Sequence, residues 1–245
     1  FTGTSPQMQG NYNAPTAITG AAVLYVLRAL VGEDIPLTAG CLTPIKMTVP
    51  EASLINPSPP AAVVAGNVET SQAMTNCLLL ALGKLGASQG TMNNFTFGNA
   101  RVQYYETIAG GSGAGEGFDG ASATQVHMTN SKLTDVEIME KRYPVRVLSH
   151  SVRVDSGGKG MWSGGNGTSR VVEFLEDMEV SILSGHRDIP PPGCAGGAAG
   201  AVGINRVIRA NGHAERLGGT VSLSVSTGDK ICIDTPGGGG YSAED

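Results

Sequence analysis

Glycine is the residue that most constrains the fold of this chain, because it supplies 36 of the 245 residues. That share is about twice the roughly 7% of an average protein. The glycines follow no three-residue period, which excludes a collagen helix, and the apolar runs between them argue against disorder. We therefore expect tight turns, bulges and irregular β-structure around an aliphatic core, since only 5% of the residues are aromatic.

Residues 89–130 are the part of the chain richest in glycine, asparagine, threonine and tyrosine. They place amide side chains, the carboxylate of Glu106 and the imidazole of His127 on a flexible backbone. Polar groups on loops that a scaffold holds in place are typical of functional sites. An imidazole near carboxylates could bind a divalent metal or transfer protons, whereas a lone histidine is often structural. The segment is the predicted site, and both interpretations of His127 stay open.

Charge and hydropathy exclude two classes of partner. The net charge is −5, and no basic cluster exceeds two adjacent residues, so we expect no nucleic-acid partner. No apolar run approaches the roughly 18–20 residues of a membrane span, so we expect no membrane partner. The four cysteines form no CxxC pair, which favours reduced, buried thiols in a cytoplasmic protein; they are Cys41, Cys77, Cys194 and Cys232.

Apolar residues at helical spacing predict two helices, over 13–30 and 69–85. Asn13 or Thr16 can cap the first. The expected apolar face of the second consists of Met74, Cys77, Leu78, Ala81, Leu82 and Leu85. A short third helix begins at Thr134, where Thr134 and Glu137 match a capping box, and stops before Pro144.

The hydrophobic pattern changes to alternation after Pro144, which predicts a series of strands. Alternation over 145–154 switches face near Ser149, which indicates a bulge there. The expected strands are 45–49, 102–107, 145–154, 170–175, 180–183, 206–209, 221–225 and 230–233. We predict an α+β fold, with a mixed α/β portion over 1–144 that holds the glycine-rich site, and a mostly antiparallel β module over 145–245.

Three glycine motifs are open to more than one interpretation. GEGFDG at 115–120 matches a dinucleotide-binding pattern, but the sequence after it makes a poor helix, so a glycine-rich loop is favoured. GASQG at 86–90 matches a serine-hydrolase elbow, but a helix precedes it where a strand is needed, so a turn is favoured. GGGGY at 237–241 fits equally well with a backbone close to a ligand and with chain packed against chain.

Several strings together resemble the hydantoinase B/5-oxoprolinase family, which includes the α-type subunits of acetone and acetophenone carboxylases. The matching strings, in consistent order, are FTGTSP at 1–6, VVAGNVETSQ at 63–72, SQGTMNNFTFG at 88–98, YYETIAGGSGAG at 104–115, HMTN at 127–130, EIMEKRYPV at 137–145, SGGKG at 156–160 and TPGGGGY at 235–241. The strings EIMEKRYPV and LGGTVSLSVSTGDKI most resemble the oxoprolinase branch of the family. The chain departs from the family pattern at residues 184–187, where a Ser-Glu-Arg-Arg string is usual.

The resemblance implies the C-terminal portion of an ATP-dependent amidohydrolase that opens a cyclic amide, 5-oxoproline to glutamate or a hydantoin-like ring. ATP with Mg would be bound mainly by an A-type subunit or fused half, and a possible divalent metal would be bound upstream. Because the chain opens at Phe1 without Met, we expect it to be part of a longer polypeptide. The resemblance implies that the A-type half is missing from it, so we expect the fragment to be inactive alone and the complete protein to be an oligomer.

Within this hypothesis the polar residues of 89–130 take specific roles. We assign proton or water handling to Glu106 and His127. Contact with the substrate is assigned to Asn93, Asn94, Tyr104, Asn130, Gly111 and Gly113. Two alternatives stay open, namely a subunit of an ATP- and metal-dependent ketone carboxylase, and a non-catalytic scaffolding half that packs on an A-type ATP-binding subunit.

Overall fold

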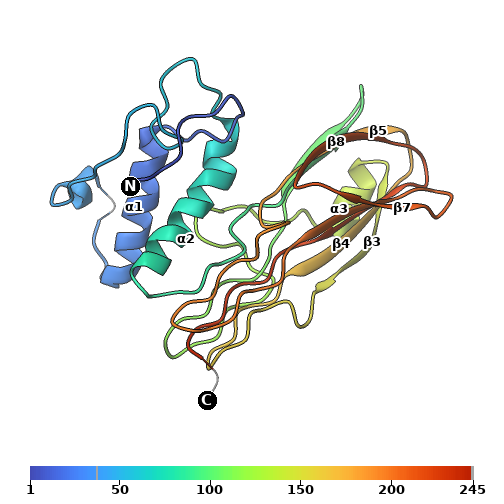
Figure 1. The fold of residues 1–245 in the computed structure, drawn as a ribbon. Helices are drawn as coiled ribbons and strands as arrows, with labels where there is room; N and C mark the ends of the chain where they lie inside the picture. The colour runs from blue at the N-terminus through green and yellow to red at the C-terminus, as the bar shows by residue number, and fades with distance from the viewer. Residues whose placement is uncertain (37, 244–245) are drawn as a thin grey trace.

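A computed structural model describes residues 1–36 and 38–243, and it shows a helical layer beside two antiparallel β-sheets (Figure 1). The helical layer contains α1, Thr16–Val31, and α2, Ser71–Ala81, packed against each other. A 3₁₀ turn, η1 at Ala39–Leu42, and a π-helical turn, η2 at Gly66–Thr70, complete it. None of the helices in the described residues has the length and hydropathy needed to cross a membrane. The predicted α+β class is confirmed.

Helix α1 begins two residues later than the expected Asn13 cap would place it. Its first flanking residue is Pro15, and no side chain caps it. The Asn13 side chain is instead buried in the preceding loop, where its amide nitrogen donates to the carbonyl oxygens of Met8, Gly10 and Ala62. Thr19 fixes the same helix to the following loop, since its hydroxyl donates to Ile55 O at 2.8 Å.

Of the predicted apolar face of the second helix, Met74 is buried and Leu78 and Leu85 are half-buried, but the other three residues are exposed. Helix α2 buries its polar residues Ser71, Gln72, Thr75 and Asn76, while Cys77, Ala81 and Leu82 are exposed. Met74 packs in an apolar cluster with Ala22 of α1, whereas the polar residues of α2 face the backbone of neighbouring loops. Gln72 donates to Val126 O at 3.1 Å, and Asn76 exchanges two hydrogen bonds with the backbone of Ser88. A polar face is what such a backbone-rich neighbour requires.

Two antiparallel sheets form the rest of the molecule. One has the order β2-β1-β5-β8, from β1 at Asn94–Gly98, β2 at Gln103–Thr107, β5 at Met178–Leu183 and β8 at Thr220–Val225. The other has the order β3-β4-β9-β6-β7, from β3 at Val145–Val152, β4 at Thr168–Phe174, β9 at Lys230–Asp234, β6 at Ile204–Ile208 and β7 at Ala214–Leu217. Strands from both sides of Pro144 share the first sheet, and the division into 1–144 and 145–245 stays a prediction.

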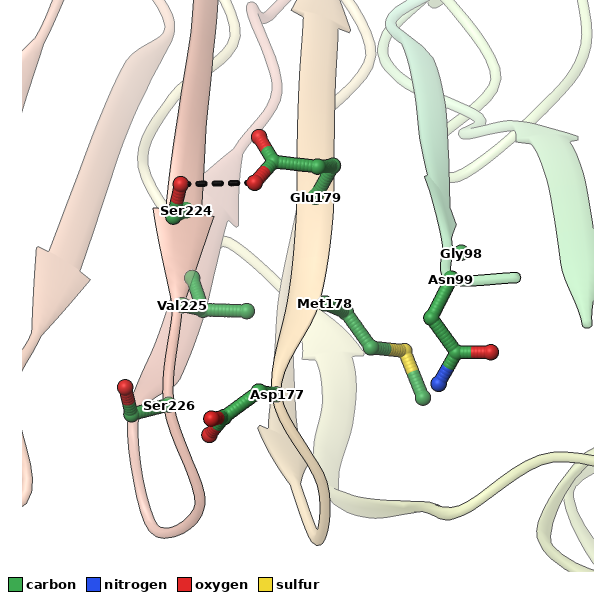
Figure 2. Close-up of a pocket in the computed structure, with 8 residues that line it drawn as sticks. All are labelled: Gly98, Asn99, Asp177, Met178, Glu179, Ser224, Val225 and Ser226. Atoms are coloured by element: carbon green, nitrogen blue, oxygen red, sulfur yellow. Dashed lines mark hydrogen bonds between the residues drawn. The ribbon is translucent and has the colours of Figure 1, made fainter. Parts of the chain in front are cut away.

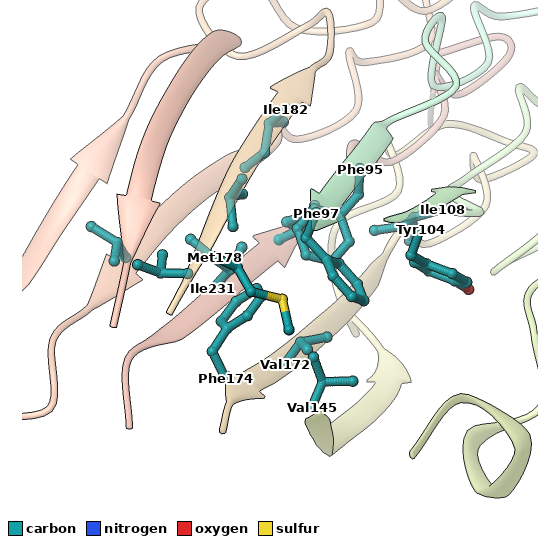
Figure 3. Close-up of a cluster of buried hydrophobic side chains, with 14 of the residues drawn as sticks. Phe95, Phe97, Tyr104, Ile108, Val145, Val172, Phe174, Met178, Ile182 and Ile231 are labelled. Carbon is teal, nitrogen blue, oxygen red and sulfur yellow. The ribbon is translucent and has the colours of Figure 1, made fainter. Parts of the chain in front are cut away.

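The main hydrophobic core lies between these sheets (Figure 3). Phe95 and Phe97 of β1 point into it and are fully buried, and Phe97 packs edge-on against Phe174 of β4. Valine and isoleucine from the other strands fill the remainder, as strand alternation requires. No strand was predicted over 94–98, although the two phenylalanines of this segment anchor a core strand.

Most of the expected strands are present within a few residues of their predicted bounds. The pairing of β3 with β4 shifts register between Val147 and Ser149, which confirms the predicted bulge. Residues 45–49 form no strand. The third helix, α3 at Val136–Arg142, is capped by Asp135 and not by Thr134, because the Asp135 carboxylate accepts from the amides of Glu137 and Ile138.

Extended glycine-rich segments pack backbone against backbone below the sheets, toward the C-terminus in Figure 1. We call them the glycine bundle, which comprises residues 86–90, 110–115, 156–167, 192–200 and 236–241. Gly238 N donates to Gly165 O at 2.9 Å, and Gly165 N donates to Ser112 O at 2.8 Å. A β-carbon on Gly238 would stand 1.9 Å from Ser112 O. The packing interpretation of GGGGY is thus confirmed.

Candidate functional site

A buried polar network lies where η2 meets the start of β1. The π-helical turn carries Glu69, which is 5% exposed. Its Oε1 accepts from the Thr91 hydroxyl at 2.9 Å, from Met92 N at 3.2 Å and from Asn94 Nδ2 at 2.8 Å. Burial raises the pKa of Glu69 to about 7, although these donors and the charge of Arg187 lower it. A carboxyl group with this pKa can exchange a proton near neutral pH.

Arg187 brings a second buried charge to this network. Its Nη2 donates to Asn93 Oδ1 at 2.9 Å and to Asn205 Oδ1 at 3.0 Å, and its Nη1 donates to Gly185 O at 2.7 Å. Burial lowers the pKa of Arg187 to about 10, and the Glu69 charge opposes that shift. Asn93 is itself fully buried and bonds Gln89 Oε1 and Ile108 O. The predicted site residue Asn93 therefore supports the network from inside.

Asn94 connects the network to a surface pocket of about 400 Å³. Its Oδ1 accepts from the Tyr105 hydroxyl at 2.7 Å, while its Nδ2 donates to Glu69 and to Leu183 O. The pocket lies between the η2 region and the outer face of the four-stranded sheet. It is lined by Asn11, Val64, Val68, Asn94, Thr96, Tyr105, Ser181, Ile182, Leu183, Thr220, Val221 and Ser222. Asn94 is the predicted site residue that reaches this pocket.

Glu106 and Tyr104 lie elsewhere, in the core between the two sheets. Arg170 Nε is 2.7 Å from Glu106 Oε1, and Arg170 Nη2 is 3.1 Å from Glu106 Oε2. The Tyr104 hydroxyl donates to Glu106 Oε2 at 2.8 Å. Burial and the adjacent carboxylate raise the pKa of Tyr104 to about 12. Both oxygens of Glu106 are thus engaged within the protein, and only 4% of the residue is exposed.

His127 connects the helical layer to the loop that carries it. Its Nε2 is 3.1 Å from Asn76 Oδ1 on α2, and its Nδ1 is 3.3 Å from the Tyr25 hydroxyl on α1. An amide oxygen can only accept, so Nε2 carries the proton and Nδ1 accepts from Tyr25. Burial lowers the pKa of His127 to about 4. The imidazole is therefore neutral at physiological pH and joins the two helices.

The remaining predicted residues are divided between the surface and the glycine bundle. Asn130 is exposed. Gly111 and Gly113 are buried in the bundle, where β-carbons would stand 1.9 Å from Gly165 O and 1.7 Å from Gly86 O. The structure brings Asn93 and Asn94 together. It does not bring Glu106 and His127 into one pocket with them.

A second pocket, of about 230 Å³, opens at one end of the four-stranded sheet (Figure 2). Asp177 and Glu179 supply its carboxylates, and the Ser224 hydroxyl donates to Glu179 Oε1 at 2.6 Å. None of the predicted site residues lines it. We therefore centre the candidate site on the pocket beside Asn94.

The sequence motifs considered for a dinucleotide and for a serine nucleophile do not adopt the geometry that these sites need. Among the described residues, no group of three histidine, cysteine, aspartate or glutamate side chains has the arrangement of a metal site. The GEGFDG segment forms a loop closed by a Gly115–Phe118 bridge, and no helix follows it to bind a pyrophosphate. Ser88 of the GASQG string is fully buried and accepts from Gly113 N, so the serine elbow is also absent.

Sequence reasoning missed Glu69, Arg187 and Tyr105. Glu69 lies just before α2, and the helix predicted over 69–85 was described by its apolar residues, which do not include Glu69. The sequence does show a polar stripe after Glu69 at helical spacing, namely Ser71, Gln72, Thr75 and Asn76, but not that this stripe is buried. A stripe of small polar residues opposite apolar ones does not by itself tell which side is buried.

The cysteines are only partly as expected. All four are free, and Cys194 and Cys232 are buried. Cys77 is exposed on α2, which corrects the prediction of four buried thiols. The side of α2 that carries Cys77 is exposed.

Comparison with known proteins identifies relatives of the whole chain. The model of the Hydantoinase B/oxoprolinase family matches residues 1–244. A 5-oxoprolinase from Dictyostelium discoideum is 49% identical over 245 residues, which is 100% of this chain and 19% of the relative. The 5-oxoprolinase 1 of Arabidopsis thaliana is 49% identical over 241 residues, 98% of this chain and 19% of the relative. The chain thus spans about a fifth of the length of these relatives.

The fold is also found in a solved structure. The crystal structure of an ATP-dependent caprolactamase from Pseudomonas jessenii superposes with a TM-score of 0.86 at 23% sequence identity. The match covers 98% of this chain and 45% of the caprolactamase chain. The helical layer and the paired sheets therefore occur together inside a longer polypeptide.

Proposed function

Because the chain belongs to the hydantoinase B/oxoprolinase family, we propose that it is part of an ATP-dependent enzyme that hydrolyses a cyclic amide. The favoured reaction opens 5-oxoproline to glutamate. The observation that carries this proposal is the 49% identity, over the whole chain, to a protein named 5-oxoprolinase. A hydantoin-like ring is the alternative substrate within the same reaction class.

The chain supplies one portion of that enzyme. It corresponds to 19% of the relative's length, and its described residues offer no cradle for a nucleotide. We therefore assign ATP and Mg to an A-type subunit or fused half, and we expect the 245-residue chain to be inactive alone. The amide bond of a lactam is stabilised by resonance, and activation of its oxygen by ATP makes ring opening by water chemically reasonable.

The pocket beside Asn94 is the part of this chain best suited to contact the substrate. It joins hydroxyl and amide groups to the buried Glu69, whose pKa near 7 allows it to accept or release a proton. Asn94 bridges Glu69 and Tyr105 through hydrogen bonds of 2.8 and 2.7 Å. The buried Asn93 and Arg187, which hydrogen-bond each other, belong to the same polar network below the pocket.

The assignment of Glu106 and His127 to the chemical step stays a prediction. Their contacts support positioning roles, because Glu106 binds Arg170 and Tyr104 inside the core and His127 joins two helices. The same holds for substrate contacts of Tyr104, Asn130, Gly111 and Gly113. Activity measurements on single variants separate the two kinds of role.

The experiment uses the complete enzyme that carries this chain. ATP hydrolysis is measured with and without 5-oxoproline, and in parallel with acetone and bicarbonate, which a ketone carboxylase requires. We expect 5-oxoproline alone to stimulate ATP hydrolysis. Stimulation that depends on bicarbonate would replace the proposal by the carboxylase alternative. Stimulation by neither compound would contradict the opening of 5-oxoproline and leave the hydantoin-like ring as the substrate to be tested.

A pair of tyrosine variants tests the pocket. Tyr105→Phe removes the hydroxyl that faces Asn94, and we expect KM for 5-oxoproline to rise about tenfold, the effect of one lost hydrogen bond. Tyr241→Phe is the matched control, since that hydroxyl bonds Gly83 O beside the glycine bundle. Equal KM values for the two variants would remove the pocket from the proposal.

A further inference from the structure

A row of hydroxyl side chains crosses the outer face of the four-stranded sheet. The row is set by strand register and consists, each residue opposite the next, of Tyr105, Thr96, Ser181 and Ser222. Because side chains alternate between the two faces of a strand, this row points away from the core, and all four residues line the pocket beside Asn94. Serine and threonine are common on the solvent face of an antiparallel sheet, so the row alone does not define a site.

At the end of the pocket formed by Asn94 and Tyr105, the direction of each hydrogen bond is fixed. Asn94 Nδ2 donates to Glu69 Oε1 and to Leu183 O, both at 2.8 Å, so both of its hydrogens are used inside the protein. The Tyr105 hydroxyl donates its single hydrogen to Asn94 Oδ1 at 2.7 Å. Neither side chain therefore has a hydrogen left to donate to a ligand.

The oxygen atoms of the same two side chains can still accept. Among the described residues, no group donates to the Tyr105 hydroxyl oxygen, and Asn94 Oδ1 accepts only from Tyr105. Burial and the charge of Glu69 raise the pKa of Tyr105, so its hydroxyl stays neutral and keeps the hydrogen that faces Asn94. Tyr105 is 52% exposed, which leaves its oxygen open to a ligand. Asn94 and Tyr105 thus present only acceptors to the pocket.

The remaining walls of the pocket suit an uncharged ligand group. None of the residues that line the pocket is charged. Val64 and Val68 give it an apolar wall, and Ser181 Oγ lies 2.8 Å from Ser222 Oγ, so these two hydroxyls bond each other. A carboxylate placed here would have no counter-ion among the lining residues, whereas an uncharged ring would meet apolar carbon and neutral hydroxyl groups.

We propose that the Tyr105 hydroxyl oxygen, oriented by Asn94, accepts a hydrogen bond from the ring N–H of the cyclic amide. The pocket then selects rings that carry this hydrogen, because a lactone, whose ring oxygen replaces the N–H, would set two acceptors against each other. The carboxylate of 5-oxoproline lies outside the pocket. This inference rests on the proposed function for the class of substrate, and it deepens that function by naming the group that the pocket recognises.

Calorimetric binding to the complete enzyme, with a non-hydrolysable ATP analogue and Mg present, tests this inference without turnover. The two probes are 5-oxoproline and the lactone in which a ring oxygen replaces its N–H. We expect the unsubstituted enzyme to bind the lactone at least about tenfold more weakly than 5-oxoproline. In Tyr105→Phe, 5-oxoproline should lose about tenfold in affinity while the affinity for the lactone changes by less than about threefold. Tyr241→Phe, whose hydroxyl bonds Gly83 O away from the pocket, should bind both probes as the unsubstituted enzyme does.

Three results would overturn the inference. Equal affinities of the unsubstituted enzyme for the two probes would show that the N–H is not recognised, and this comparison needs no variant. An equal loss of affinity for both probes in Tyr105→Phe would show that the hydroxyl does not contact that hydrogen. Absence of binding by either probe would also overturn it. The expected binding pattern without any hydrolysis of ATP, when ATP replaces the analogue, would overturn the proposed function and leave the inference standing.

Discussion

Arg170 of β4 and Glu106 of β2 form a two-point ion pair that connects the two sheets through the core. The distances are 2.7 Å between Nε and Oε1 and 3.1 Å between Nη2 and Oε2. Both side chains are almost fully buried. Arg170 also lies 3.3 Å from the sulfur of Met139 on α3. This ion pair thus fixes the position of β4 in one sheet relative to β2 in the other.

Removing one partner of this pair should be far more costly than removing an exposed partner. Glu106→Gln leaves the Arg170 charge buried without its counter-ion, and we expect a loss of about 3–5 kcal/mol in the free energy of unfolding. Glu173→Gln is the matched control, since its partner Arg146 is largely exposed and 3.5 Å away; a loss below about 1 kcal/mol is expected. Urea unfolding measures both. Equal losses would contradict the structural role of the pair.

The buried groups Glu69 and His127 should give opposite pH dependences of stability. The folded pKa of His127 is lowered from 6.5 to about 4, so its contribution is complete above pH 6.5 and is lost as pH falls toward 4. The folded pKa of Glu69 is raised from 4.5 to about 7, so its contribution is complete below pH 4.5 and is lost as pH rises through 7. Between pH 4.5 and 6.5 the two slopes oppose each other.

Single variants should separate these slopes. In His127→Gln, the free energy of unfolding should fall more steeply between pH 4.5 and 7 than in the unsubstituted protein. In Glu69→Gln it should rise more steeply between pH 4 and 6.5. Unfolding in urea across pH 4–8 measures both, and differences from the unsubstituted protein remove the contribution of other titrating groups. Two variants with the same pH profile would show that neither group is titrated as described.

The glycine bundle should not tolerate a single added methyl group. Gly238→Ala places a β-carbon 1.9 Å from Ser112 O, where both partners are backbone, so we expect loss of about 3 kcal/mol or more, or failure to fold. Gly218→Ala is the control, because its nearest atom, Thr220 O, is 3.7 Å away. That variant should change stability by less than about 1 kcal/mol. Thermal unfolding of the two proteins compares them, and a stable Gly238→Ala variant would contradict the packing.

His127 can be tested for catalysis apart from packing. Glutamine at this position can still donate to Asn76 and accept from Tyr25, so we expect His127→Gln to keep turnover within about tenfold in the complete enzyme. Loss of about 100-fold or more, in a variant that remains folded, would instead support proton transfer by the imidazole. His213→Gln, in an exposed turn, controls for nonspecific effects.

The strands and the family could be predicted from the sequence because both signals are local. Alternation over 145–154 was sufficient to predict β3 and its bulge at Ser149. The ordered strings identified the family, and the match over residues 1–244 confirms it. Glycine content indicated close backbone packing, although not which segments meet.

The burial of α2 and the layout of the site could not be predicted in the same way. Helical spacing shows that α2 has two faces, but the burial of its polar face depends on contacts with the backbone of Ser88 and Val126. Glu106 and Glu69 look alike in sequence, whereas the fold pairs one with Arg170 and gives the other only neutral donors. Such differences arise from contacts between residues far apart in the chain.

We propose that this chain works within an enzyme that couples ATP hydrolysis to the opening of 5-oxoproline. The most direct measurement is the amount of glutamate and ADP formed by the complete enzyme supplied with 5-oxoproline, ATP and Mg. We predict that glutamate and ADP are formed together. When 5-oxoproline is left out, no glutamate should form and ADP should form more slowly. ADP formation that is unaffected by 5-oxoproline, with no glutamate produced, would contradict the claim.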